Sequence, residues 1–355
     1  MKRRDFNQAA LAAPFVAQAT LAQAAGSPNS ALLNAYYLRA HMYTSVPRQV
    51  REDLRWMADI GTSIVSIAVL EHELVTAVKN IDTICDEAAK AGLQVYAIPA
   101  CWGALTAAGG VPSVFTAKNP QTWMLKQDGS PIQGLTGPVS SIHYPETFQF
   151  FCESLDALCK QFDIKGVIWD EPKGFRVDHS PRAVAALGKN APEVEHFKAT
   201  TDFHSRVNRY IKGRYPDKTI CLFTQPHFPR AFSEAASRVA LLDYFGADGR
   251  SWDLEEDAKW KGFGEGNESG KGKVLLGNGE RLLELARQQG IKTLFLVENH
   301  NLPAVMLPAL DAGLPKVLAK NVDMLVYYYY PRNIEEPERN MSIVAKHIGA
   351  RFRKR

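Results

Sequence analysis

The stretch Gly166-Val-Ile-Trp-Asp170-Glu171-Pro172 ends a short apolar run with two carboxylates. Short β-branched and aromatic runs bounded by turn residues are typical of buried strands. The stretch Leu294-Phe-Leu-Val-Glu298-Asn299 repeats the pattern, with a glutamate directly after the apolar residues. Burial raises the pKa of a carboxylate, so an acidic residue at this place is disfavoured unless something pairs with it or uses it. The two stretches therefore predict parallel strands whose carboxyl ends carry functional residues.

Outward from these stretches, short apolar runs alternate with longer amphipathic segments from residue 33 onward. Such alternation predicts repeated strand-helix units and a parallel sheet. We predict eight strands, at residues 33–43, 62–70, 93–100, 166–170, 219–224, 240–247, 293–297 and 324–330. We predict eight helices between and after them, at residues 47–60, 82–91, 146–161, 201–214, 231–238, 279–289, 303–319 and 336–351. Strict alternation of eight and eight predicts an α/β fold of one domain, a (β/α)8 TIM barrel over residues 25–355.

An open, doubly wound sheet also alternates strands and helices. It is usually marked by a glycine-rich turn after its first strand, and no such turn follows Tyr43. The glycines of residues 262–266 follow no predicted strand and open no predicted helix, so they do not indicate a nucleotide site. They belong to a polar segment, residues 249–279, which we interpret as a solvated loop, with a lid over the site as the alternative.

Composition limits the possible partners. The chain has 355 residues, 46% of them hydrophobic, and a formal charge of only +4. Its basic residues gather at the two ends while the body is near neutral, which argues against nucleic acid as a partner. Five cysteines are an odd number and do not suggest a disulfide framework.

The first 24 residues have the composition of an export signal. Lys2, Arg3 and Arg4 precede an apolar run too short to span a bilayer as an anchor, and small residues follow it at the expected cleavage site. The stretch Arg3-Arg4-Asp5-Phe6 resembles the twin-arginine export motif, although Asn7 replaces its usual leucine, so the Sec route stays open. We therefore expect a periplasmic or secreted protein.

Polar residues that directly follow the predicted strands form a candidate site. In a (β/α)8 barrel the active site lies at the carboxyl ends of the strands, so these side chains are expected to converge. The candidates for substrate binding are Arg39, His41, Glu71, Trp102, Asp170, Gln225, His227, Tyr244, Asn299 and Tyr328. The rim also includes His72, Asp248, His300, Arg332 and Asn333.

With these residues in place, the chain resembles the clan of barrel glycosidases that carry catalytic glutamates on strands four and seven. That clan has Asn-Glu-Pro on strand four, and this chain has Asp170-Glu171-Pro172. Its nucleophile follows the apolar run of strand seven, as Glu298 does. The resemblance implies a retaining glycoside hydrolase with a carbohydrate substrate and no cofactor, in which Glu171 is the acid/base and Glu298 the nucleophile. In that mechanism two carboxyl groups lie about 5–5.5 Å apart.

The chain departs from the clan at two positions. Asp170 replaces the asparagine that contacts the sugar, so Asp170 either changes the hydrogen bonding there or takes part in acid chemistry. The usual tryptophan of strand eight is replaced by the tyrosines of residues 327–330. Tyr244 lies in the region from which the clan often sends a tyrosine to the nucleophile.

Other interpretations remain open from the sequence. A metal-dependent barrel enzyme could use the side chains of His41, Glu71, Glu171, His227 and Glu298, but the sequence contains no metal-binding motif of known spacing, and we expect no metal. A barrel that binds a glycan without cleaving it is a second alternative. The glutamates could also be simple ion-pair partners, Glu171 of Lys173 or Arg176, and Glu298 of Arg332.

Overall fold

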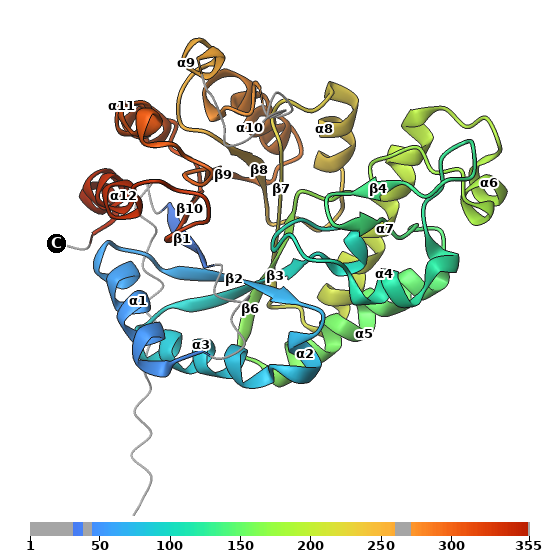
Figure 1. Ribbon diagram of the computed structural model, residues 1–355, viewed down its shortest axis with the longest axis horizontal. Coiled ribbons are helices and arrows are strands. Elements are labelled where there is room, and N and C mark those ends of the chain that lie inside the picture. The colour runs from blue at the N-terminus through green and yellow to red at the C-terminus, as the bar shows by residue number, and fades with distance from the viewer. Residues whose placement is uncertain (1–30, 38–44, 260–270, 354–355) are drawn as a thin grey trace, which may run out of the picture. The chain divides into compact units, whose positions relative to one another are not determined.

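The computed structural model describes residues 31–37, 45–259 and 271–353. Eight parallel strands close into a barrel in the order β1-β10-β9-β8-β7-β6-β3-β2, with β1 paired to β2 (Figure 1). The barrel strands are β1 (Leu32–Tyr37), β2 (Ile64–Leu70), β3 (Gln94–Ala100), β6 (Ile164–Asp170), β7 (Thr219–Thr224), β8 (Tyr244–Gly249), β9 (Lys292–Val297) and β10 (Met324–Tyr328). The predicted (β/α)8 TIM barrel is confirmed.

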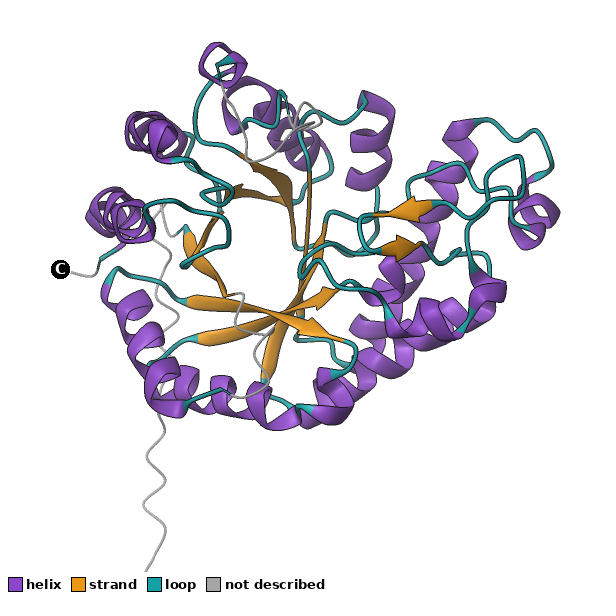
Figure 2. Cartoon of the chain, in the orientation of Figure 1, coloured by secondary structure: helices purple, strands orange, loops and turns teal. Residues whose placement is uncertain are grey.

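Helices surround the barrel, as Figure 2 shows by colour. The eight that were predicted are α1 (Pro47–Asp59), α3 (Val78–Lys90), α5 (Pro145–Gln161), α7 (Glu193–Arg214), α8 (Arg230–Ser237), α10 (Glu280–Gln288), α11 (Leu307–Leu318) and α12 (Pro337–Phe352). Short elements that were not predicted are α2 (Glu73–Thr76), α4 (Val114–Lys118), α6 (Pro181–Leu187), α9 (Leu254–Ala258) and the hairpin of β4 (Gln133–Gly134) and β5 (Gly137–Pro138). None of the described helices has the length and apolar character needed to cross a membrane.

Helix α1 shows how the sequence forms these elements. Val50, Leu54 and Met57 recur at helical spacing and are the buried residues of this helix. Pro47 stands in the first turn, where its missing N–H is not needed. Gly61, with φ of +95°, follows the helix and turns the chain toward β2.

Two layers of apolar side chains hold the barrel together. The layer between strands and helices is large and continuous, and residues such as Leu54, Phe151 and Phe245 belong to it. Inside the barrel a second cluster includes Ile98, Ile168 and Leu296. Alternating residues of each strand supply the two layers, so the barrel is a packed core with no pore and the site must lie at its mouth.

One strand was predicted too early. Strand β8 spans Tyr244–Gly249, whereas the apolar residues suggested 240–247. Leu241 has φ of +62°, which no strand residue adopts, and Asp243 accepts a hydrogen bond from the amide of Ile220. Gly246 then brings β8 close to β9, because a Cβ at this position would lie 1.6 Å from the carbonyl oxygen of Leu294. This correction places Asp248, and not Tyr244, at the carboxyl end of β8.

Candidate active site

The two predicted glutamates lie at the mouth of the barrel. Glu171 follows β6, and its amide donates to the carbonyl of Phe223 on β7 at 3.1 Å. Glu298 follows β9, and its amide donates to the carbonyl of Gly249 on β8 at 2.9 Å. Each residue is therefore hydrogen-bonded through its backbone to the neighbouring strand. Both side chains are buried at the carboxyl end of the barrel.

The backbone at Glu171 is strained. Its φ of +41° lies in the left-handed region, which costs a residue with a side chain about 1–3 kcal/mol. The following Pro172 disfavours helical conformations here as well. Strain of this kind persists where the surrounding structure fixes it, and it is concentrated at functional sites.

Lys273 connects the carboxylates. Its ammonium nitrogen lies 3.0 Å from Oε1 of Glu171, 3.0 Å from Oδ2 of Asp248 and 3.0 Å from Oε1 of Glu298. An ammonium group has three N–H donors, so this buried lysine can serve all three carboxyl groups. Because both glutamate oxygens lie 3.0 Å from one nitrogen, they are at most twice that distance, 6.0 Å, from each other.

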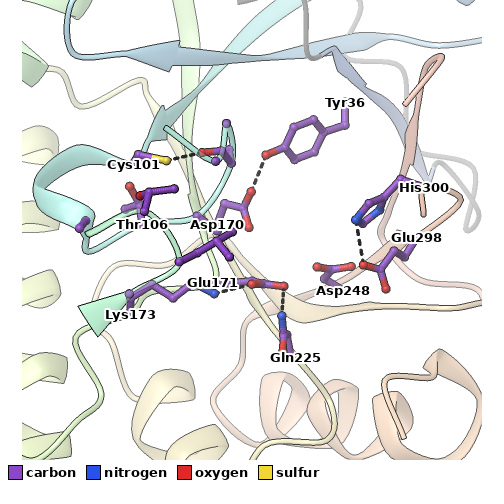
Figure 3. A pocket seen from close by; sticks show the side chains of 18 of the residues that line it. Tyr36, Cys101, Thr106, Asp170, Glu171, Lys173, Gln225, Asp248, Glu298 and His300 are labelled. Carbon is purple, nitrogen blue, oxygen red and sulfur yellow. Dashed lines mark hydrogen bonds and ion pairs between the residues drawn. The ribbon is translucent and has the colours of Figure 1, made fainter. Parts of the chain in front are cut away.

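Glu171 has two further side-chain partners and Glu298 has one (Figure 3). Oε2 of Glu171 pairs with Nζ of Lys173 at 2.5 Å, and Oε1 accepts from the Gln225 amide at 2.6 Å. Oε1 of Glu298 lies 3.2 Å from Nε2 of His300. Oε2 of Glu298 is buried and has no hydrogen-bond partner among the described residues.

Both glutamates are ionised, although burial alone would favour their neutral forms. Burial raises the pKa of Glu171, but the Lys173 and Lys273 ammonium groups outweigh it and hold that pKa well below its usual value. Burial also opposes ionisation of Glu298, and Lys273 again outweighs it, so the pKa of Glu298 is lowered. The expectation that burial raises the pKa of these carboxyls was wrong for both. The pairing of Glu171 with Lys173 was one of the alternatives from the sequence, whereas Lys273 was not predicted.

The protonated carboxyls are the two aspartates. Burial and the neighbouring Glu171 carboxylate raise the pKa of Asp170 to about 7. Burial, together with the charges of Glu298 and Glu171, raises the pKa of Asp248 well above its usual value even beside Lys273. Asp248 and Glu171 both lie 3.0 Å from Nζ of Lys273, so a carboxyl with a raised pKa lies beside an ionised one.

Aromatic side chains from β1 and β10 complete the floor. The hydroxyl of Tyr36 donates to Oδ2 of Asp170, as Figure 3 shows. The Tyr36 and Tyr328 rings lie 4.6 Å apart, and the His300 ring lies 4.7 Å from that of Tyr328. Burial lowers the pKa of His300 to about 4, so its imidazole is neutral at physiological pH. These groups line a cavity of about 550 Å³, large enough for a small ligand.

Of the twelve predicted site residues, five line the cavity and five others of the described chain have different surroundings. Asp170, Glu171, Gln225, Glu298 and Tyr328 line the cavity. Arg39 and His41 lie outside the described residues.

Two predicted rim residues stabilise the segment after β3 without lining the cavity. Oε1 of Glu71 accepts from the amide of Gly103 at 2.9 Å and from the hydroxyl of Ser113 at 2.6 Å. Trp102 is fully buried, and its indole N–H donates to the carbonyl of Val69 at 2.8 Å. Both side chains therefore hold a loop in place.

Three more predicted residues also lie outside the cavity lining. Tyr244 begins β8 and therefore lies at the opposite end of that strand from Asp248. Asn299 is buried, and its amide donates to the carbonyl of Tyr328 at 3.0 Å and to the side chain of Asn340 at 2.8 Å. His227 is half-buried, and burial and Lys273 lower its pKa.

Lys273 and Tyr36 are the important residues that were not predicted. Lys273 belongs to the segment interpreted as a solvated loop, but its carbonyl accepts from the amide of Arg250 at 2.8 Å and Val274 bridges to that residue in parallel. This pairing continues β8 and places Lys273 at the site. The apolar run that follows Lys273, residues 274–276, was the one available signal of a buried segment.

The arrangement does not favour the metal-dependent alternative. No group of three or more His, Cys, Asp or Glu side chains is placed to hold a metal ion in the described part of the chain. Glu71, one of the proposed ligands, uses both carboxylate oxygens to hold residues 103–115. The cation at the centre of the carboxylates is Lys273.

The fold and this carboxyl-rich mouth define a (β/α)8 barrel protein with a candidate active site at the carboxyl ends of its strands. No protein-family model matches the sequence, and no curated protein matches it either. Solved structures similar to this chain include glycosidases, at identities that show the fold alone. The β-amylase catalytic domain of Paenibacillus polymyxa has a TM-score of 0.62 at 10% identity, over 92% of this chain and 99% of that domain.

Two larger glycosidases contain a similar barrel. The β-galactosidase of Halorubrum lacusprofundi has a TM-score of 0.62 at 13% identity, over 90% of this chain and 58% of its own. The α-L-fucosidase isoenzyme 2 of Paenibacillus thiaminolyticus has a TM-score of 0.56 at 10% identity, over 90% of this chain and 48% of its own. The chain thus spans about half of each of these enzymes.

Proposed function

We propose that this protein is a retaining glycoside hydrolase, with Glu298 as nucleophile and Glu171 as acid/base. The observation that carries the proposal is the shared contact with Lys273, which keeps the two Oε1 atoms within 6.0 Å. Retaining glycosidases hold their carboxyl groups about 5–5.5 Å apart, whereas inverting ones need about 6.5–9.5 Å to admit a water. The fold that this chain shares with known glycosidases is consistent with the assignment.

The charge states give each residue its role. Lys273 and His300 lie against Oε1 of Glu298 and favour its ionised form, which a nucleophile needs. Glu171 is ionised as well, but Asp248, which shares Lys273 with it and has a raised pKa, can supply the proton that passes to the leaving oxygen. The acid of this mechanism is then the Asp248–Glu171 pair acting together.

The stereochemistry of the product tests the proposal. We expect the mature protein, residues 25–355, to hydrolyse at least one sugar in a panel of aryl α- and β-glycosides, with retention at the anomeric carbon. Proton NMR at early times distinguishes retained from inverted product. Inversion would rule out Glu298 as a nucleophile, and failure on every glycoside would favour the glycan-binding alternative.

The pH dependence follows from Asp170. The pKa of Asp170 is about 7, so the group is neutral below that pH and can donate a hydrogen bond to a sugar hydroxyl. Above pH 7 it becomes a second negative charge beside Glu171, and we expect kcat/KM to fall there. In Asp170→Asn this alkaline limb should move to higher pH. An alkaline limb of kcat/KM that is identical in wild type and Asp170→Asn would show that another group controls it.

A further inference from the structure

The cavity has more positive charge than its carboxyls balance. Four cationic side chains line it: Lys173, Arg176, Lys273 and Arg332. The two lysines pair with the ionised Glu171 and Glu298. Of the remaining carboxyls, Asp170 has its pKa raised to about 7 and Asp248 has its pKa raised well above the usual value, so neither balances the arginines as an ordinary carboxylate would. The two arginines therefore leave a net positive cavity, which favours an anionic ligand.

Arg176 is a half-buried arginine of the cavity lining that no carboxylate of the described chain neutralises. Its Nη1 donates to the carbonyl of Gln133 on β4 at 3.2 Å, and no carboxylate in the described part of the chain forms an ion pair with it. Burial lowers the pKa of this guanidinium, since the charge is partly removed from water without an opposite charge beside it. A guanidinium in this situation gains strongly when a ligand brings a carboxylate, because two parallel N–H···O bonds can form.

Arg332 adds charge to the same cavity. Its Nη1 would lie 3.0 Å from a Cβ at Gly110, so the glycine, with φ of +65°, leaves room for this guanidinium beside the cavity. Within the described ranges Arg332 has no ion-pair partner. Its charge contributes to lowering the pKa of His300, whose imidazole is neutral at physiological pH. Because Arg332 is exposed, its contribution is long-range attraction, whereas the half-buried Arg176 can provide a specific contact.

We propose that the cavity selects an acidic sugar, a uronic acid residue, and that Arg176 binds the carboxylate of that sugar. That the ligand is a sugar rests on the proposed glycosidase function. Binding of the sugar acid can be measured without turnover. Arg176 is a specificity-determining residue in this account, and a neutral hexose leaves its guanidinium without a partner.

Matched pairs of ligands test the proposal. Aryl β-D-glucuronide and aryl β-D-glucoside differ only at C6, and the α-anomers and galacto counterparts extend the comparison. We expect kcat/KM to be at least tenfold higher for the acid of the preferred pair, with the advantage shrinking as salt rises. Arg176→Gln should reduce the acid-to-neutral ratio at least tenfold, mainly through KM. Arg55→Gln, an exposed arginine of α1, is the control and should change neither value.

A binding experiment separates this proposal from the glycosidase proposal. Saturation-transfer NMR with D-glucuronate, D-galacturonate, D-glucose and D-galactose needs no catalysis. Preferential binding of a sugar acid that is lost in Arg176→Gln supports the proposal even when no glycoside is cleaved. Equal binding of acids and neutral sugars, or cleavage of neutral glycosides in preference to uronides, overturns it and leaves the glycosidase proposal intact.

Discussion

Glu298→Gln is expected to lower kcat by a factor on the order of 10⁴ or more, as loss of a covalent nucleophile does in other hydrolases. Glutamine keeps the shape of the side chain but cannot attack the anomeric carbon as an ionised carboxylate can. A carboxylate oxygen of Glu298 is the atom expected to form the bond to the sugar. The measurement is kcat on the glycoside that wild type cleaves fastest.

Glu171→Gln should give a different pattern, which separates the two roles. A general acid contributes about 10²–10⁴ to the rate, and its contribution shrinks when the leaving group needs no proton. The loss should therefore be large for alkyl glycosides and small for aryl glycosides with an acidic phenol. Glu195→Gln, an exposed residue of α7, is the matched control and should leave kcat unchanged. Equal losses for both leaving groups would remove Glu171 from the role of acid.

How far the sequence predicts this site depends on how local each signal is. Glu171 and Glu298 were identified because each directly follows the apolar run of one strand. Gln225 and Tyr328 were found by the same rule, since carboxyl strand ends meet at one rim. Barrel closure itself was predictable because eight alternations leave few other topologies.

The failures have physical reasons as well. A polar residue after a strand can face the cavity or the adjoining loop. Glu71 faces the loop, because its carboxylate accepts hydrogen bonds from the backbone N–H groups of residues 103 and 115, which would otherwise lack an acceptor. Tyr244 was misplaced by an error in strand boundary, the least reliable part of any sequence-based prediction. Lys273 was missed because it reaches the site through tertiary pairing with Arg250, 23 residues away in the chain, which no local period encodes.

Lys273 is where the largest effect on stability is expected. In Lys273→Met the side chain keeps its length, but Glu171, Asp248 and Glu298 lose the ammonium that lies 3.0 Å from each of them. Removing one partner of a buried ionic cluster costs about 3–5 kcal/mol, because the remaining charges stay buried without compensation. We expect that loss in the free energy of unfolding, measured in urea at pH 8, together with at least a hundredfold loss of kcat/KM.

The pH dependence of that loss has a definite sign. Lys273 is the main cation that lowers the pKa of Glu298, so without it the folded pKa of Glu298 rises above that of the unfolded chain, whereas Glu171 keeps Lys173. A carboxyl with a raised folded pKa takes up a proton more readily when folded, so the variant should regain stability as pH falls from 8 to 5. Lys273→Arg keeps the charge and should lose less, and Lys173→Met, which removes a cation from Glu171 alone, should also lose less. An unfolding free energy of Lys273→Met equal to that of wild type at both pH values would mean that the carboxyls do not depend on this lysine. In that case the ionised state of Glu298, on which the nucleophile assignment depends, would need another source.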